Sequence, residues 1–144
     1  MSFLTEDEER QVVAAITEAE NGCHGEIRVR LERHSRPNVL DSAANAFARL
    51  KMHKTRLRNG ILFFVATEDH RFAVIGDAGI NRYVTQDFWD EVTRTVECAF
   101  REGRIMEGLI AGINMCGAVL KKHYPVVDGE EDLDELPNDI SKEK

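Results

Sequence analysis

The sequence predicts an α/β fold, a single-domain sandwich in which a small mixed β-sheet is flanked by helices. Residues 26–32 alternate between apolar and charged side chains, which is typical of a half-exposed strand. Residues 61–66 are continuously apolar, which favours a strand covered on both faces, and residues 105–122 repeat apolar side chains at helical spacing. A chain of 144 residues has the size of one domain and can bury roughly two-thirds of its unfolded surface. We therefore expect one core that needs no disulfide or metal ion to fold.

The first elements along the chain are a helix, a strand and a second helix. Thr5 and Glu8 have the spacing of a capping box, and the apolar side chains that follow predict a helix over residues 5–20. The strand at residues 26–32 comes next, and an amphipathic pattern then predicts a helix over residues 40–52. Because another strand follows this helix, the first two strands are expected to lie parallel across a right-handed crossover.

Two strands form the predicted centre of the sheet. Residues 61–66 and 72–75 are close enough in sequence to pair as an antiparallel hairpin, although their connection lacks the glycine that the tightest turns favour. Apolar periodicity then predicts helices over residues 85–101 and 105–122. The complete order is α-β-α-β-β-α-α, so helices are expected to pack against a small mixed sheet.

Charge is distributed unevenly along the chain. The net charge is −7, and residues 128–144, with eight acidic and two basic residues, contribute −6 of it. We therefore divide the chain into an α/β domain at residues 1–127 and an acidic C-terminal tail at residues 128–144, which is expected to be disordered or loosely docked. Residues 28–58 carry nine basic and two acidic residues. This basic region predicts either a solvated surface or an anion site, and the acidic tail is a candidate to dock against it.

The cysteines and the apolar runs exclude several classes of protein. Cys23, Cys98 and Cys116 stand at spacings that match neither a zinc site nor a redox pair, and no charged and apolar leader opens the sequence. A reducing, cytoplasmic environment is the simplest expectation. The longest apolar stretch, residues 105–120, contains polar interruptions and is shorter than the ~20 residues that a membrane span requires. We expect no direct membrane insertion and no nucleic-acid partner.

The most distinctive turn of the sequence is Gly76-Asp77-Ala78-Gly79, directly after the last predicted strand. Glycines permit unusual backbone angles there, and a carboxylate at a strand end faces the rim of the sheet, where ligands often bind. Asp77 is therefore the leading candidate for a functional carboxylate, and the alternative is a turn aspartate that hydrogen-bonds its own backbone. Asp87 is a candidate to join it around calcium or magnesium, which prefer oxygen ligands. The alternative role of Asp87 is to stabilise the N-terminus of its own helix.

A parallel first pair and an antiparallel hairpin bring three strand ends to one edge of the sheet. Glu26, Arg58 and Asn59 are then expected to share that rim with Asp77. Glu26 is a candidate metal ligand beside Asp77, and Arg58 is a candidate to bind a phosphate group. Ordinary solvated surface is the simpler interpretation of both Glu26 and Arg58.

Several segments, in order along the chain, resemble the TPM domain family. They are HGEIRVRL, KTRLRNGILFFVA, HRFAVIGDAGI and the C-terminal DELPNDIS, and the similarity covers about residues 4–141. The resemblance implies an α/β sandwich with a mixed central sheet and divalent-cation binding in some members. It also implies a phosphatase activity that rests mainly on a thylakoid-lumen acid phosphatase of the plant branch. The Gly-Asp turn is similar to that of the short, soluble bacterial members.

Two functions are compatible with these features. In the first, which we favour, the protein is a non-catalytic module whose rim binds calcium or magnesium, or a segment of a membrane-associated protein, in membrane-protein maintenance or stress handling. In the second, it is a metal-assisted acid-type phosphatase that acts on phosphomonoesters. Asp77, with Asp87 or Glu26, would then hold the ion, and Arg58 would steady the phosphate.

Overall fold

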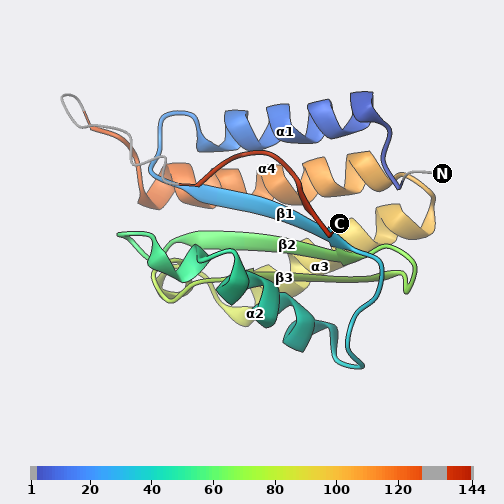
Figure 1. The fold of residues 1–144 in the computed structure, drawn as a ribbon. Helices are drawn as coiled ribbons and strands as arrows, with labels where there is room; N and C mark the ends of the chain where they lie inside the picture. The colour runs from blue at the N-terminus through green and yellow to red at the C-terminus, as the bar shows by residue number, and fades with distance from the viewer. Residues whose placement is uncertain (1–2, 128–135, 144) are drawn as a thin grey trace.

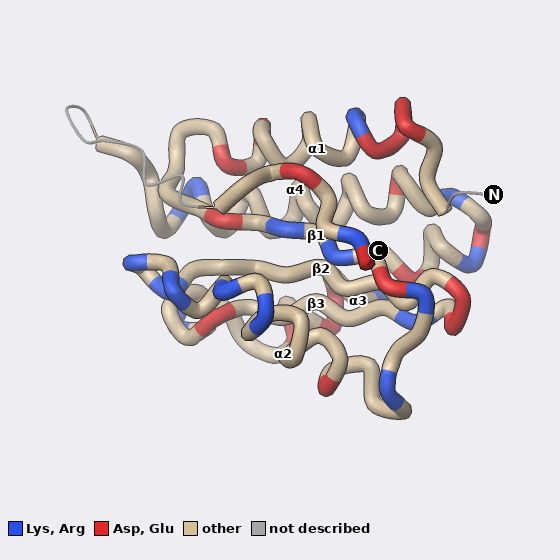
Figure 2. Tube along the Cα trace, viewed as in Figure 1, with Lys and Arg blue, Asp and Glu red and all other residues tan. Residues whose placement is uncertain are grey.

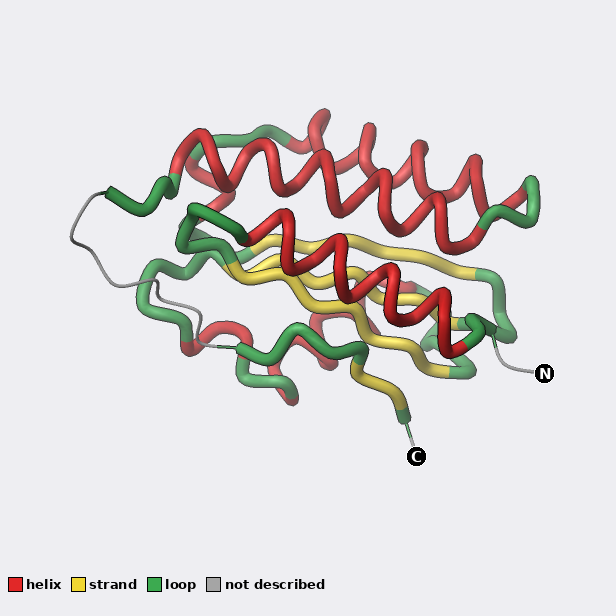
Figure 3. The backbone as a smooth tube through the Cα atoms, turned by 90° about the horizontal axis from the view of Figure 1, so that it is seen from above, coloured by secondary structure: helices red, strands yellow, loops and turns green. Residues whose placement is uncertain are grey.

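The computed structural model describes residues 3–127 and 136–143, and it confirms the α/β fold. A four-stranded mixed sheet with the order β3-β2-β1-β4 lies between two layers, as Figure 1 and Figure 3 show. The helices and strands are α1 (Glu6–Glu20), β1 (Glu26–Glu32), α2 (Val39–Arg49), β2 (Gly60–Ala66), β3 (Arg71–Gly76), α3 (Gln86–Arg101), α4 (Ile105–His123) and β4 (Ser141–Lys142). Two short 3-10 helices, η1 (Met52–Lys54) and η2 (Ile80–Arg82), precede β2 and follow β3.

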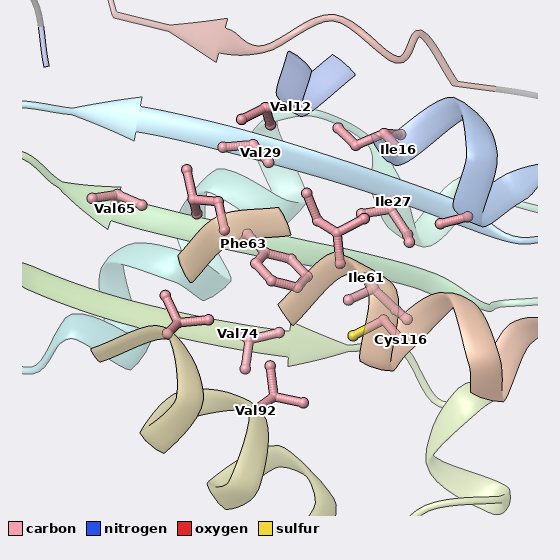
Figure 4. Close-up of a cluster of buried hydrophobic side chains, with 14 of the residues drawn as sticks. Val12, Ile16, Ile27, Val29, Ile61, Phe63, Val65, Val74, Val92 and Cys116 are labelled. Carbon is pink, nitrogen blue, oxygen red and sulfur yellow. The ribbon is translucent and has the colours of Figure 1, made fainter. Parts of the chain in front are cut away.

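Each face of the sheet has its own hydrophobic cluster. On one face, α1, α3 and α4 pack against side chains such as Val29 of β1 and Phe63 of β2, and Figure 4 shows Phe63 in the middle of this cluster. On the other face, α2 covers Leu62 and Phe64. Alternating residues of β2 thus enter different clusters, which explains why its sequence is apolar without interruption. None of the described helices is long and apolar enough to cross a membrane.

The expected capping box at the start of α1 is present, whereas α2 ends earlier than predicted. Thr5 accepts a hydrogen bond from the Glu8 N–H, and the Glu8 side chain accepts one from the Thr5 N–H. α2 stops at Arg49, and Lys51 then adopts a left-handed conformation with φ 58°. An α-helix cannot continue through that conformation, so the chain passes into the separate turn of η1.

The predicted pairing of the three long strands is confirmed. β1 and β2 are parallel, with Glu26 opposite Gly60, and β2 and β3 form the antiparallel hairpin. In place of a glycine, His70 takes the left-handed conformation in the connecting turn, with φ 55°. Asp69 fixes this turn to the end of β1, because its carboxylate bonds His34 Nδ1 at 2.9 Å and the Ser35 N–H at 2.8 Å.

His34 predicts a pH-dependent contribution to stability. Its hydrogen bond to Asp69, with the charges of Asp69 and Glu68, raises the pKa of His34 above its ordinary value of 6.5. A raised pKa in the folded state stabilises the fold below the unfolded pKa, and this stability is lost as the pH rises through the raised value. The effect is small, because the ring is exposed to solvent. Between about pH 6 and 8, the free energy of unfolding in urea should fall more in the wild type than in His34→Gln, and equal slopes would contradict the prediction.

Residues 136–143 lie along β1 and supply a fourth strand that the sequence pattern did not predict. β4 pairs in parallel with Arg30 and Leu31 of β1, and Figure 1 shows the C-terminal segment over that strand. A strand of two residues is too short to show an alternation of apolar and polar side chains, so the sequence carried no signal for it.

Opposite charges accompany this docking. Arg28 Nη2 lies 3.6 Å from Asp139 Oδ1, and Glu143 Oε1 accepts a hydrogen bond from the Arg33 N–H at 2.6 Å. The acidic segment therefore lies on part of the basic region at residues 28–58. The domain boundary between residues 127 and 128 stays a prediction, and the first eight residues of the predicted tail lie outside the described residues.

Candidate functional site

Three strand ends lie in one row at the rim of the sheet. Glu26, at the start of β1, is opposite Gly60, at the start of β2, and Gly76, at the end of β3, is opposite Ile61. Neighbouring strands in a sheet are about 4.8 Å apart, so the connection before β2 and the turn after β3 lie side by side. The rim that the sequence predicted is therefore present as an arrangement of backbone.

Asp77 is an almost buried carboxylate, and Arg58 donates a hydrogen bond to each of its two oxygens. Only 7% of the Asp77 side chain is exposed. Arg58 donates from Nε to Oδ2 at 2.6 Å and from Nη2 to Oδ1 at 2.8 Å. The Ala78 N–H donates to Oδ1 at 2.7 Å, so Asp77 bonds its own turn as well. A bidentate pair of this kind fixes both the position and the plane of the carboxylate.

Arg58 reaches Asp77 because two backbone segments lie in contact. Arg58 adopts a left-handed conformation with φ 52°, and its carbonyl accepts a hydrogen bond from the Gly79 N–H at 2.7 Å. A Cβ atom on Gly79 would stand 2.2 Å from the carbonyl oxygen of Leu57, so only glycine permits this approach. The hydrogen bond to Asp77 raises the pKa of Arg58 above its ordinary value. Because 52% of the Arg58 side chain is exposed, the cationic half of the pair faces solvent.

Glu26 is fully buried, so its interpretation as solvated surface is wrong. Its side chain is covered at the start of β1, where Oε2 accepts a hydrogen bond from the Leu136 N–H at 3.3 Å. The physical reason is the C-terminal segment, which covers this end of the strand. Arg58 has the solvent exposure that the surface interpretation implies, and it is paired with Asp77 in addition.

Asp87 is exposed in the first turn of α3, where a carboxylate stabilises a helix N-terminus. Across residues 3–127 and 136–143, no three His, Cys, Asp or Glu side chains are grouped so that they could hold a metal ion. Asp77, Asp87 and Glu26 thus do not form a preassembled cage in the described chain. A cation at Asp77 would compete with Arg58 for the carboxylate and would need carbonyl oxygens or water as further ligands.

The surroundings of Asp77 are basic. Figure 2 shows Lys and Arg gathered on the connection between α2 and β2, which includes Lys51, Lys54, Arg56 and Arg58. A concentration of positive charge attracts anions and opposes cations. The local positive charge therefore stabilises the ionised carboxylate of Asp77, and a free cation would have to compete with Arg58 to reach it.

Asn59, which was expected at the rim, and Glu20, which was not, both have supporting roles there. Asn59 is 1% exposed, and its Nδ2 donates to the His24 carbonyl at 2.8 Å, which ties the connection before β2 to the entry of β1. Glu20, at the end of α1, accepts a hydrogen bond from the Ile27 N–H at 2.8 Å. A polar residue directly before an apolar strand was a signal for Asn59, whereas nothing in the sequence distinguished Glu20 from a surface glutamate.

Solved structures share this fold along nearly the whole chain. The BA42 protein from the psychrophilic bacterium Bizionia argentinensis, known from NMR, is 45% identical, with a TM-score of 0.89 over 99% of this chain and 97% of BA42. The N-terminal domain of a P. gingivalis protein is 17% identical, with a TM-score of 0.71 over 85% of this chain and 80% of that one. The N-terminal domain of cg2496 from Corynebacterium glutamicum is 13% identical, with a TM-score of 0.65 over 89% and 81%. The last two similarities concern the fold alone.

Comparison at the level of sequence families gives the same result. A search of curated proteins finds no match to this chain. A family model of the TPM domain matches residues 1–119, which is most of the sequence. Together with the 45% identity to BA42, this match shows that the chain belongs to the TPM domain family.

Proposed function

We propose that this protein is a non-catalytic binding module in which calcium or magnesium acts at the Arg58–Asp77 pair. The observation that carries the proposal is a nearly buried carboxylate at the strand-end rim whose counter-ion is half-exposed. Arg58 also has a left-handed backbone, a conformation that is unfavourable for a residue with a side chain. Because Arg58 is exposed to solvent, a cation from solution could replace it at the Asp77 carboxylate without unfolding the turn.

In this proposal Asp77 exchanges Arg58 for the divalent ion. Asp77 offers the oxygen ligands that both ions prefer, and the neighbouring carbonyl groups and water would complete the coordination. The released Arg58 would join the basic connection before β2, so the rim would attract an acidic segment more strongly. The partner that we propose is a membrane-associated protein reached from the cytoplasm, in membrane-protein maintenance or stress handling.

A titration with calcium or magnesium chloride, followed by NMR, tests the exchange. Amide signals of residues 57–60 and 76–80 should move, and so should the Nε–H signal of Arg58, because its acceptor is taken. Asp77→Asn keeps the shape but removes the charge, and it should abolish these shifts. Arg58→Gln removes the competing cation and should tighten ion binding by about tenfold, equivalent to about 1.4 kcal/mol.

Asp41→Asn is the matched control for this titration. Asp41 is an exposed carboxylate in the first turn of α2, so its removal should leave the ion affinity unchanged. Circular dichroism of each variant confirms that the fold persists. A titration of Asp77→Asn that matches the wild type would place the ion elsewhere and end the proposal.

The same variants separate this proposal from an acid-type phosphatase. A half-exposed guanidinium beside a carboxylate is the observation that favours the alternative, because arginine binds phosphate through two parallel hydrogen bonds. The non-catalytic proposal predicts no turnover of p-nitrophenyl phosphate by the wild type with magnesium. If the wild type turns over this substrate and a folded Asp77→Asn variant does not, the non-catalytic proposal is wrong and the phosphatase alternative is supported.

A further inference from the structure

The sheet has one edge with a strand that lacks the usual protection. β3 is the edge strand on one side, whereas the C-terminal segment covers β1 on the other. From Phe72 to Gly76, β3 contains no charged residue and no proline, the devices that commonly prevent another strand from pairing there. An apolar edge strand of this kind is a template for a further strand.

The register shows which backbone groups of β3 point outward. The Asp77 N–H bonds the Gly60 carbonyl at 2.9 Å, so these two residues form a hydrogen-bonded pair of the ladder. Such pairs alternate with pairs that are not hydrogen-bonded, so the N–H and C=O groups of Gly76 and Val74 point away from β2. The side chain of Asn81 agrees with this orientation, because its Nδ2 donates to the Gly76 carbonyl at 2.9 Å.

At residues 74–76, three of the outward groups remain: the N–H and C=O of Val74 and the N–H of Gly76. They make no hydrogen bond with any residue in 3–127 or 136–143. Backbone groups of this kind are strong donors and acceptors, and proteins rarely leave them without a partner when they are covered. Val74 as a whole is only 5% exposed, so its N–H and C=O groups sit in a recess of the surface, whereas Gly76 is half-buried.

A groove of about 320 Å³ runs beside this part of β3. Leu40 of α2 lines one side, Val84 and Trp89 line the other, and residues 74–76 form part of its wall. Leu40 is 52% exposed, and within the described residues it shares this degree of exposure with two other large apolar side chains, Tyr83 and Val127. Trp89 is fixed in place, because its Nε1 donates to Asn81 Oδ1 at 2.8 Å. The groove thus offers apolar contacts on both faces of the strand edge.

We propose that β3 binds an extended peptide segment of a partner protein by strand addition at residues 74–76. The segment's backbone would bond Val74 and Gly76, and its alternate side chains would contact Leu40 on one face and Trp89 on the other. The occupant is an apolar, β-branched segment flanked by Lys or Arg. No Lys or Arg lines the groove. Asp41, Asp87 and Asp90 are exposed carboxylates that stand next in sequence to the lining residues Leu40, Gln86 and Trp89, and Arg82 is the one exposed cation next in sequence to a lining residue.

This site goes beyond the proposed cation exchange and does not depend on it. The probe is the acetylated peptide Lys-Lys-Val-Thr-Val-Thr-Val-Lys-Lys, added to the full chain. EDTA is present to remove divalent ions, so the result does not depend on whether the cation proposal is right. Amide signals of Val74 and Gly76 should shift, and their hydrogen exchange should slow. A peptide with glutamate in place of lysine should bind at least about tenfold more weakly, and one with proline at its central valine should not bind.

Leu40→Ser tests the groove itself, and Val127→Ser is its matched control. Both side chains are large, apolar and exposed, at 52% and 58%, but Val127 lies outside the groove. Leu40→Ser should weaken peptide binding by about tenfold, and Val127→Ser should leave it unchanged. Unchanged Val74 and Gly76 signals at millimolar peptide would overturn the proposal. Protection of the same amides that grows with protein concentration, without peptide, would also overturn it in favour of a second copy of this chain.

Discussion

Replacing Phe63 with alanine is expected to lower the free energy of unfolding by about 4 kcal/mol, because it removes one of the two aromatic side chains at the centre of β2. Phe63 is fully buried. Its ring lies 5.9 Å from that of Phe72 on the neighbouring strand, and it faces the backbone of Gly112 on α4. The measurement is urea denaturation. A loss below about 1.5 kcal/mol, typical of a volume-conserving change, would mean that the core closes around the cavity.

Gly112 supplies a second test of the same contact. A Cβ atom on Gly112 would stand 2.7 Å from Phe63 Cε2 and 2.8 Å from Val96 Cγ2, so Gly112→Ala should cost about 1–3 kcal/mol by overpacking. Phe63→Leu removes the ring edge that causes the clash. The double variant should therefore lose less stability than the sum of the two single variants, since residues in contact are not independent. Additive losses would mean that α4 moves away from β2 in the Gly112→Ala variant, so that the added methyl group no longer contacts residue 63.

Sequence patterns predicted the fold because its long elements each carry a repeated signal. The alternation in β1, the apolar run of β2 and the helical period of α4 each extend over at least six residues. β4 has two residues and depends on contacts with β1, about a hundred residues earlier in the chain. Such an element arises from tertiary pairing, which no local pattern encodes.

The candidate site was predictable in its location but not in its chemistry. Chain order and pairing rules brought Glu26, Arg58 and Asp77 to one rim, and the register agrees. Whether a carboxylate faces solvent, an ion or an arginine depends on side-chain directions. Those follow here from the left-handed conformation of Arg58 and from the close approach of Gly79. A sequence permits both features at many positions, so it does not identify them in advance.

Replacing Gly79 with alanine is expected to destabilise the protein by about 3 kcal/mol and to open the Arg58–Asp77 pair. Gly79 has φ −63°, which any residue adopts, so the cost is steric. The added Cβ would stand 2.2 Å from the Leu57 carbonyl oxygen and 2.6 Å from that of Arg58. Because the obstacle is backbone, no side-chain rotation relieves it. Urea denaturation measures the loss, and the Arg58 Nε–H signal should move to the position of a solvent-exposed guanidinium.

Gly103→Ala is the control that separates steric cost from conformational cost. Gly103 has φ 78° with no atom within 4 Å of an added Cβ, so alanine there costs only the left-handed penalty of about 1–2 kcal/mol. If the two variants lose the same stability, the close backbone contact at Gly79 adds no steric cost, and the prediction for Gly79→Ala is wrong. If Gly79→Ala loses more and also releases Arg58, the contact between these two segments is what holds the carboxylate of Asp77 in place. The proposed exchange at the rim would then begin from a pair that the fold itself assembles.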